Sequence, residues 1–143
     1  MTLETPSLQG KDIMSVVREE NLARLDPTGE KRALLDRSSP TRLLPGDTIR
    51  VTSYRSMSHP ASTFAFSGVI LGISRRGPES TIVIRNIVQQ LGVEMRYPVY
   101  SPMVKGIEVL ARGKKYRRAK LYYLRDQPGK TFSRISRKAM SKN

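Results

Sequence analysis

The sequence contains no cysteine and a single histidine, His59. Protein zinc sites are built mostly from thiolates and imidazoles, so a site of that kind is excluded. Without cysteine there is also no disulfide and no cysteine nucleophile. His59 stands just before Pro60 in a serine-rich stretch, which predicts a loop rather than a metal or triad site. The fold must therefore be held together by burial, and we expect neither a metal nor a cofactor.

Long apolar runs are also missing, and the longest apolar stretch lies around 69–73. A membrane-spanning helix is indicated by roughly 18 or more apolar residues in a row, so we expect no membrane span. The first 25 residues carry four acids, whereas signal peptides have a bare apolar core and transit peptides are poor in acids. We therefore expect any targeting segment to be absent or already removed.

Acidic residues are scarce, with 12 Asp and Glu against 26 Lys and Arg, which gives a formal net charge of +14. The segments 1–40, 41–111 and 112–143 carry net charges of −1, +4 and +11. A segment as basic as the last one cannot bury its own side chains, so it stays solvated or lies against a polyanion. The 143 residues are enough for one domain with a core of its own.

The first segment, 1–40, predicts a helical arm. Apolar residues recur at helical spacing over 11–25, and Asp12 can cap the start of that helix. A proline and a glycine end it. A second, short helix is expected over 30–35, before a linker at 38–40.

The middle segment, 41–111, predicts a small antiparallel barrel, so the fold class is mainly β. Rich β-branched content and partial alternation predict five strands, over 48–54, 63–73, 80–88, 93–97 and 104–111. No crossover helix separates these strands, which argues against an α/β sheet.

The second of these strands is apolar on both faces, which suits a small curled barrel. Alternation predicts two sets of side chains, with Phe64, Phe66 and Ile70 on one face and Val69, Leu71 and Ile73 on the other. Gly68 and Gly72 permit a bend or a bulge in this strand.

The acids of the middle segment are too scattered for general acid–base catalysis. Asp47, Glu79, Glu94 and Glu108 each stand in a different turn or strand. We expect Asp47 to cap a turn, and Glu94 and Glu108 to pair with nearby arginines. The sequence also lacks the Gly-x-Ser-x-Gly turn of serine hydrolases and a phosphate-binding glycine loop. We therefore expect no enzymatic activity.

The last segment, 112–143, mixes tyrosine and leucine with its cations, unlike a tail kept for solubility. Cations attract phosphates, and tyrosine rings stack on unpaired bases. We expect Leu121 and Leu124 to pin this basic extension to the domain while the flanking cations bind RNA. A basic turn between the second and third strands adds two further cations. The candidate RNA-binding residues of the turn and the extension are Arg75, Arg76, Arg112, Lys114, Lys115, Arg117, Arg118, Lys120, Tyr122, Tyr123, Arg125, Lys130, Arg134, Arg137 and Lys138.

About three-fifths of the chain, from Leu44 to about Thr131, resembles the bacterial-type large-subunit ribosomal protein nineteen family. The pieces that carry the resemblance are Pro45-Gly46-Asp47-Thr48-Ile49-Arg50-Val51, Phe66-Ser67-Gly68-Val69-Ile70, Gly92-Val93-Glu94, Ser101-Pro102 and Arg117-Arg118-Ala119-Lys120-Leu121-Tyr122-Tyr123-Leu124-Arg125-Asp126. The resemblance implies an SH3-like barrel with an N-terminal helical arm and a basic C-terminal extension. It also implies a structural, non-catalytic role: binding and stabilising rRNA of the large ribosomal subunit, beside neighbouring large-subunit proteins and near an intersubunit bridge to small-subunit rRNA.

The arm before Pro45 is longer than in bacterial members of that family, which favours a mitochondrial version in the mitochondrial matrix; a bacterial cytoplasmic or plastid origin is the alternative. The rival function is a free-standing small-barrel interaction module whose basic tail binds RNA nonspecifically. Sedimentation separates the two, because only a ribosomal protein would travel with large subunits.

Overall fold

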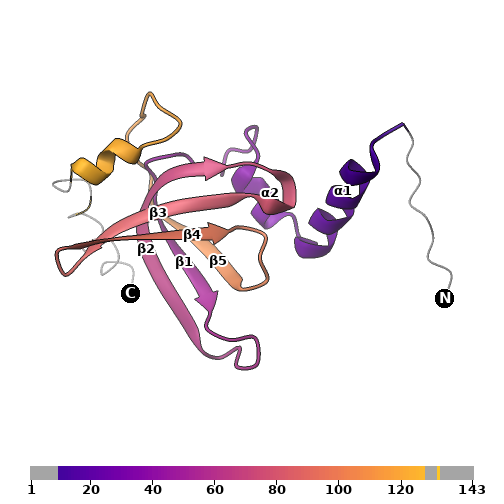
Figure 1. Cartoon of the computed structure of the whole chain (residues 1–143), viewed down its shortest axis with the longest axis horizontal. Coiled ribbons are helices and arrows are strands. Elements are labelled where there is room, and N and C mark those ends of the chain that lie inside the picture. Colours follow the sequence, from indigo (N-terminus) through magenta and orange to yellow (C-terminus); the bar gives the residue numbers. More distant parts are fainter. Residues whose placement is uncertain (1–9, 128–131, 133–143) are drawn as a thin grey trace.

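The computed structural model describes residues 10–127 and 132 (Figure 1). Its elements, in chain order, are α1 (Ile13–Leu25), α2 (Glu30–Leu35), β1 (Thr48–Tyr54), β2 (Thr63–Ser74), the 3-10 turn η1 (Gly77–Glu79), β3 (Thr81–Val88), β4 (Leu91–Pro98), β5 (Val104–Ala111) and the 3-10 turn η2 (Tyr122–Asp126). Each predicted helix and strand is present, within two residues of its expected bounds.

The five strands form one antiparallel sheet in the order β4-β3-β2-β1-β5. The mainly β class is therefore confirmed. The predicted barrel, however, is not closed, because β4 and β5 are the two edges of this sheet and do not pair with each other. Alternation along a strand predicts which faces are buried, but it does not specify whether the first and last strands of a sheet meet.

A β-bulge interrupts β2 in the middle of its pairing with β3. Ile70 lies opposite Ile84 and Gly72 opposite Val83, so Leu71 is an extra residue with no partner across the pair. A bulge of this kind shifts the alternation of side chains by one residue. The placement of Ile73 beside Val69 and Leu71 was therefore wrong: Ile73 shares a core with Phe66 and Ile70, on the other face. Phe64 is largely exposed.

The larger of two hydrophobic cores lies on one face of the sheet. It collects side chains from all five strands or their ends and from the N-terminal arm, namely Leu35, Leu43, Ile49, Val51, Phe66, Ile70, Ile73, Ile82, Ile84, Tyr97, Val99, Tyr100 and Val104. Leu22 and Leu25 of α1 pack against it. The end of α1 and the whole of α2 are thus attached to the sheet, whereas the start of α1 projects from it (Figure 1).

The start of α1 departs from the expected cap. Asp12 occupies the capping position, but its side chain makes no capping hydrogen bond. Its backbone carbonyl accepts the first helical bond, from the N–H of Val16 at 3.2 Å. Ile13 and Met14 remain about 60% and 57% exposed, because this turn of the helix lies beyond the edge of the sheet.

Candidate nucleic-acid interface

The basic extension is attached to the sheet at the β2 bulge. The extra residue of the bulge, Leu71, has a carbonyl that accepts a hydrogen bond from the N–H of Leu121 at 2.7 Å. Two residues further on, the carbonyl of Ile73 accepts a bond from Lys120 Nζ at 2.7 Å. Both carbonyls lie beyond Val69, where the pairing of β2 with β1 ends, so they are available to the extension. η2 lies against the sheet at the end of the molecule opposite α1 (Figure 1).

A second, smaller core lies under the extension, on the face of the sheet opposite the larger core. Leu121, Leu124 and Phe132 are buried there against Val69 and Leu71. Leucine burial of this kind stabilises a protein by a few kcal/mol per side chain. The expectation that Leu121 and Leu124 pin the extension to the domain is confirmed.

The start of the extension is held by one buried carboxylate, Asp47. Its oxygens accept hydrogen bonds from the N–H of Leu44 at 3.0 Å, the N–H of Gly113 at 2.9 Å and Arg112 Nη1 at 2.8 Å. The expected turn cap is the bond to Leu44. The other two bonds join the turn before β1 to the residues after β5, a pairing that no local pattern could indicate.

Close packing of backbone accompanies this carboxylate. A Cβ at Gly113 would overlap the carbonyl of Gly46, and a Cβ at Gly46 would overlap the ring of Tyr116. Gly46 also has a φ of 92°, in the left-handed region that favours glycine. The turn at 45–47 thus packs closely against the first residues of the extension.

Glu94 on β4 holds the far end of the extension. It accepts bonds from Arg85 Nη1 at 2.8 Å and from Arg125 Nε and Nη2 at 2.5 and 2.8 Å. The pairing of Glu94 with arginines is confirmed, as is that of Glu108, whose Oε2 lies 3.8 Å from Arg50 Nη1. Hydrogen bonding by Arg125, aided by Arg85, lowers the pKa of Glu94 against the opposing effect of burial.

Replacement of this carboxylate is expected to change the pH dependence of stability. Because the pKa of Glu94 is lower in the folded chain, its contribution is present above about pH 4.5 and is lost as the pH falls through the folded pKa. Glu94→Gln should lower the free energy of unfolding by about 1.5 kcal/mol at pH 7 and by less below pH 4. Urea unfolding at both pH values measures this difference. Glu20→Gln, at an exposed position of α1, is the control. An equal effect of Glu94→Gln at both pH values would contradict the lowered pKa of Glu94.

The basic candidate RNA-binding residues divide into two groups within the described part of the chain. One group makes contacts within the protein: Arg75 Nε donates to the carbonyl of Leu35 at 2.8 Å, and Arg112, Lys120 and Arg125 make the bonds given above. The other group has exposed side chains and consists of Arg76, Lys114, Lys115, Arg117 and Arg118. The candidates Lys130, Arg134, Arg137 and Lys138 lie outside the described residues.

Two arginines that the sequence analysis missed complete a basic hollow, here called the arginine groove. It has a volume of about 380 Å³ and is lined by Arg37, Arg42, Leu44, Pro45, Ile73, Arg75, Tyr116, Arg117, Arg118 and Ala119. Arg37 and Arg42 come from the segment that joins α2 to β1. No lining residue is acidic, and burial together with the charges of Arg37 and Arg42 lowers the pKa of Arg75. The groove therefore concentrates positive charge from three separate parts of the chain.

Tyrosines adjoin this groove. A second hollow beside it is lined by Lys115, Tyr116, Arg117, Arg118 and Tyr123. The guanidinium of Arg118 lies 5.5 Å from the centre of the Tyr123 ring, and that of Arg125 lies 4.8 Å from the centre of the Tyr122 ring. The predicted cations and tyrosines of the extension are thus brought together, with Tyr116 shared by both hollows.

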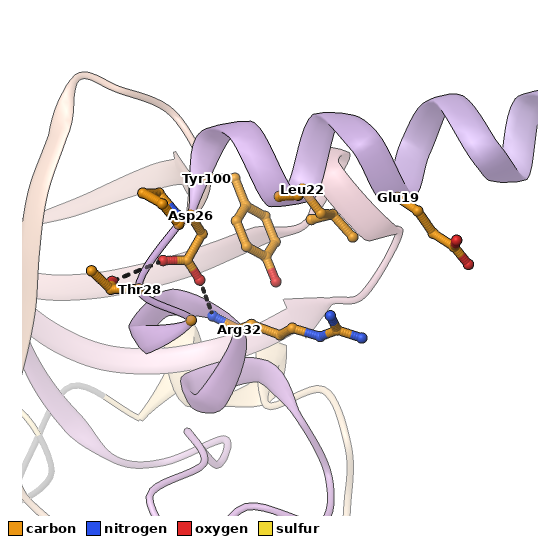
Figure 2. A pocket seen from close by; sticks show the side chains of 9 residues that line it. Glu19, Leu22, Asp26, Thr28, Arg32 and Tyr100 are labelled. Carbon is orange, nitrogen blue, oxygen red and sulfur yellow. Dashed lines mark hydrogen bonds between the residues drawn. The ribbon is translucent and has the colours of Figure 1, made fainter. Parts of the chain in front are cut away.

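A third hollow, of about 320 Å³, lies at the other end of the molecule, between α1, α2 and Tyr100 (Figure 2). Asp26 accepts hydrogen bonds there from the backbone N–H of Arg32 at 2.8 Å and the hydroxyl of Thr28 at 3.4 Å. Burial of the Tyr100 side chain raises its pKa, and the negative charge of Asp26 raises it further. Glu19 and Asp26 make this hollow unsuited to phosphate, and its hydrogen bonds fix the turn between the helices.

The described residues hold no group of three metal-ligating side chains, and none of their helices is long and apolar enough to cross a membrane. The fold and the site together define a small basic β-sheet protein whose positive charge gathers around a docked extension.

The chain belongs to the ribosomal protein L19 family, whose model matches residues 29–138. It is 39% identical over 123 residues to the large ribosomal subunit protein bL19m of Schizosaccharomyces pombe, covering 84% of this chain and 68% of that relative. It is also 39% identical over 115 residues to bL19m of Neurospora crassa, covering 80% of this chain but 42% of that longer relative. The resemblance inferred from the sequence is confirmed, and the family is one of ribosomal structural proteins, not of enzymes.

Proposed function

We propose that the chain is a structural component of the large subunit of the mitochondrial ribosome and that its extension binds rRNA there. The observation that carries the proposal is the arginine groove beside a row of exposed cations on an extension already fixed to the sheet. Membership of the ribosomal protein L19 family supports it, as do two relatives named as mitochondrial large-subunit proteins.

Binding would follow from phosphate neutralisation. Cations released from the RNA on binding favour the complex, so affinity falls steeply as salt rises. If about six to ten phosphates are engaged, duplex DNA shows a loss of roughly 10³ to 10⁵ in affinity between 50 and 200 mM salt, and RNA is expected to show a shallower loss. Lys114, Lys115, Arg117 and Arg118 would make the main contacts. Arg75, Arg112, Lys120 and Arg125 would act mainly by fixing the shape of the surface, because each already bonds to the protein.

The three-part division belongs to this proposal. In it, the segment 1–40 would serve as a helical arm toward neighbouring large-subunit proteins, 41–111 as the sheet domain and 112–143 as the rRNA-binding extension. Contact with small-subunit rRNA through an intersubunit bridge would involve the exposed cations of the extension, with further phosphate contacts from Lys130, Arg134, Arg137 and Lys138, which lie outside the described residues.

Sedimentation of gently lysed mitochondria tests the proposal. The full chain should travel with large subunits at low salt and leave them only at high salt. The double variant Arg117→Ala with Arg118→Ala should be incorporated less and should reduce the salt slope of RNA binding by about two. Arg55→Ala with Lys105→Ala removes the same charge from exposed positions elsewhere and is the matched control.

Unchanged incorporation of the Arg117 and Arg118 double variant would contradict the assignment of these contacts. A wild-type chain found in light fractions at low salt would contradict the ribosomal role itself, and would favour the free-standing module with a nonspecific tail.

A further inference from the structure

The arginine groove is only half basic. Its other lining residues are Leu44, Pro45, Ile73, Tyr116 and Ala119, which are apolar or aromatic. An RNA duplex presents phosphates and sugar hydroxyls to a protein surface and keeps its base faces stacked inside. Phosphates do not cover these apolar lining residues, here called the floor of the groove. The exposed face of an unpaired base would cover them.

Tyr116 is held as a fixed platform at one side of this floor. Its ring packs so closely on Gly46 that a Cβ there could not be accommodated. Tyr116 also packs against the smaller core, and it lines both the arginine groove and the neighbouring hollow. A ring that is already packed against the protein loses little freedom when a base stacks on it, which favours binding. Leu44, 42% exposed, lies at the same floor, although it belongs to neither core.

The charges around this floor lack a counterion within the groove. Five arginines line it without an acid among the lining residues. The nearest buried carboxylate, Asp47, is already bonded to Arg112 and two backbone N–H groups. Arginine is the side chain suited to bidentate contact with phosphate. The two phosphates that flank one nucleotide would therefore meet the arginine walls while its base meets the floor.

We infer that the arginine groove binds one unpaired nucleotide of the RNA, with the base against Tyr116 and the Leu44–Pro45 edge and the flanking phosphates on Arg37 and Arg117. Arg42 donates a hydrogen bond from Nη1 to the carbonyl of Arg37 and so helps to fix the shape of the groove. The inference rests on the proposed function and specifies its ligand. A volume of about 380 Å³ falls within the range of sites that enclose a small molecule, which admits one nucleotide.

Binding of the full chain to three fluorescein-labelled RNAs tests this inference. The first is a short perfect duplex, the second is the same duplex with one bulged uridine, and the third replaces that uridine by an abasic residue. Fluorescence anisotropy at one fixed salt concentration should show about tenfold tighter binding of the bulged uridine than of the other two. Equal affinity for all three would overturn the inference but not the proposed function. Failure to bind any of them would overturn both.

Variants of the groove connect this preference to its residues. Tyr116→Leu should remove the preference for the bulged uridine, and Tyr116→Phe should retain it, because the ring and not the hydroxyl forms the platform. Arg37→Gln, at an exposed position, should weaken bulge binding severalfold, whereas Arg55→Gln should not. Arg55 follows the last residue of β1, whereas the groove lies beside the first, so the strand separates them by about 20 Å.

A crosslinking experiment avoids any loss of fold in a variant. A 4-thiouridine at the bulge should crosslink on irradiation to the peptide that contains Tyr116 in the wild-type chain. A crosslink only to peptides outside the groove would contradict the inference.

Discussion

Leu121→Ala is expected to lower the free energy of unfolding by about 3 kcal/mol, the middle of the range for leucine truncated in a core. Leu121 is fully buried in the smaller core, and its N–H is bonded to the bulge at Leu71. The loss combines the missing transfer free energy with a cavity between the extension and β2. Urea unfolding followed by circular dichroism measures it.

The control for this prediction is Leu91→Ala, because Leu91 is 70% exposed in the hairpin between β3 and β4. Its truncation should change the free energy of unfolding by less than about 0.5 kcal/mol. Equal effects of the two variants would mean that the extension does not contribute to the folded state, and the account of the smaller core would be wrong.

Asp47→Ala is expected to destabilise the chain by a similar amount, about 3 kcal/mol. The side chain of Asp47 is 3% exposed, so the N–H groups it accepts from would lose a charged acceptor with little water to replace it. Asp47→Asn keeps one carbonyl oxygen and should cost about half as much. Thermal unfolding at neutral pH gives the order of the three chains.

Glu108→Ala is the matched control, because it also removes a carboxylate paired with an arginine. That side chain is 51% exposed and lies 3.8 Å from Arg50, so its loss should cost less than about 1 kcal/mol. A loss at Asp47 no larger than at Glu108 would show that burial of the carboxylate does not matter.

The bounds of the helices and strands could be predicted from the sequence because each has a local periodic signal. The faces of β2 could be predicted only up to its bulge. Gly72 indicated that a bulge was possible, but the unpaired residue is Leu71, and this shift turns Ile73 to the other face. The register of a strand depends on its partner, which a single strand does not encode.

The hairpin between β3 and β4 shows a different limit. Gln89 and Gln90 have φ values of 51° and 67°, so both occupy the left-handed region without a glycine. Such two-residue hairpin turns are usually recognised by Asn-Gly or Asp-Gly. The fourth strand was expected to begin at Val93, whereas pairing with β3 extends it back to Leu91.

The extension could be predicted from composition, since its charge density and its tyrosines are visible in the sequence. The arginine groove could not. Arg37 and Arg42 lie in or beside a segment of net charge −1, and only the packing of Leu35 and Leu43 into the larger core brings them to Arg117 and Arg118. Nor could the sequence separate cations that face solvent from Arg112 and Arg125, whose carboxylate partners are 65 and 31 positions away.

The bulge at Leu71 also implies that one contact depends on another. It exists only once β2 and β3 have paired, and both strands leave the ribosome that makes the chain before residues 112–127 do. Because chains emerge from the N-terminus and begin to fold as they do, the surface that receives the extension can be complete when the extension arrives. Residues 112–127 can thus dock on a protein surface that has already formed, rather than fold together with it.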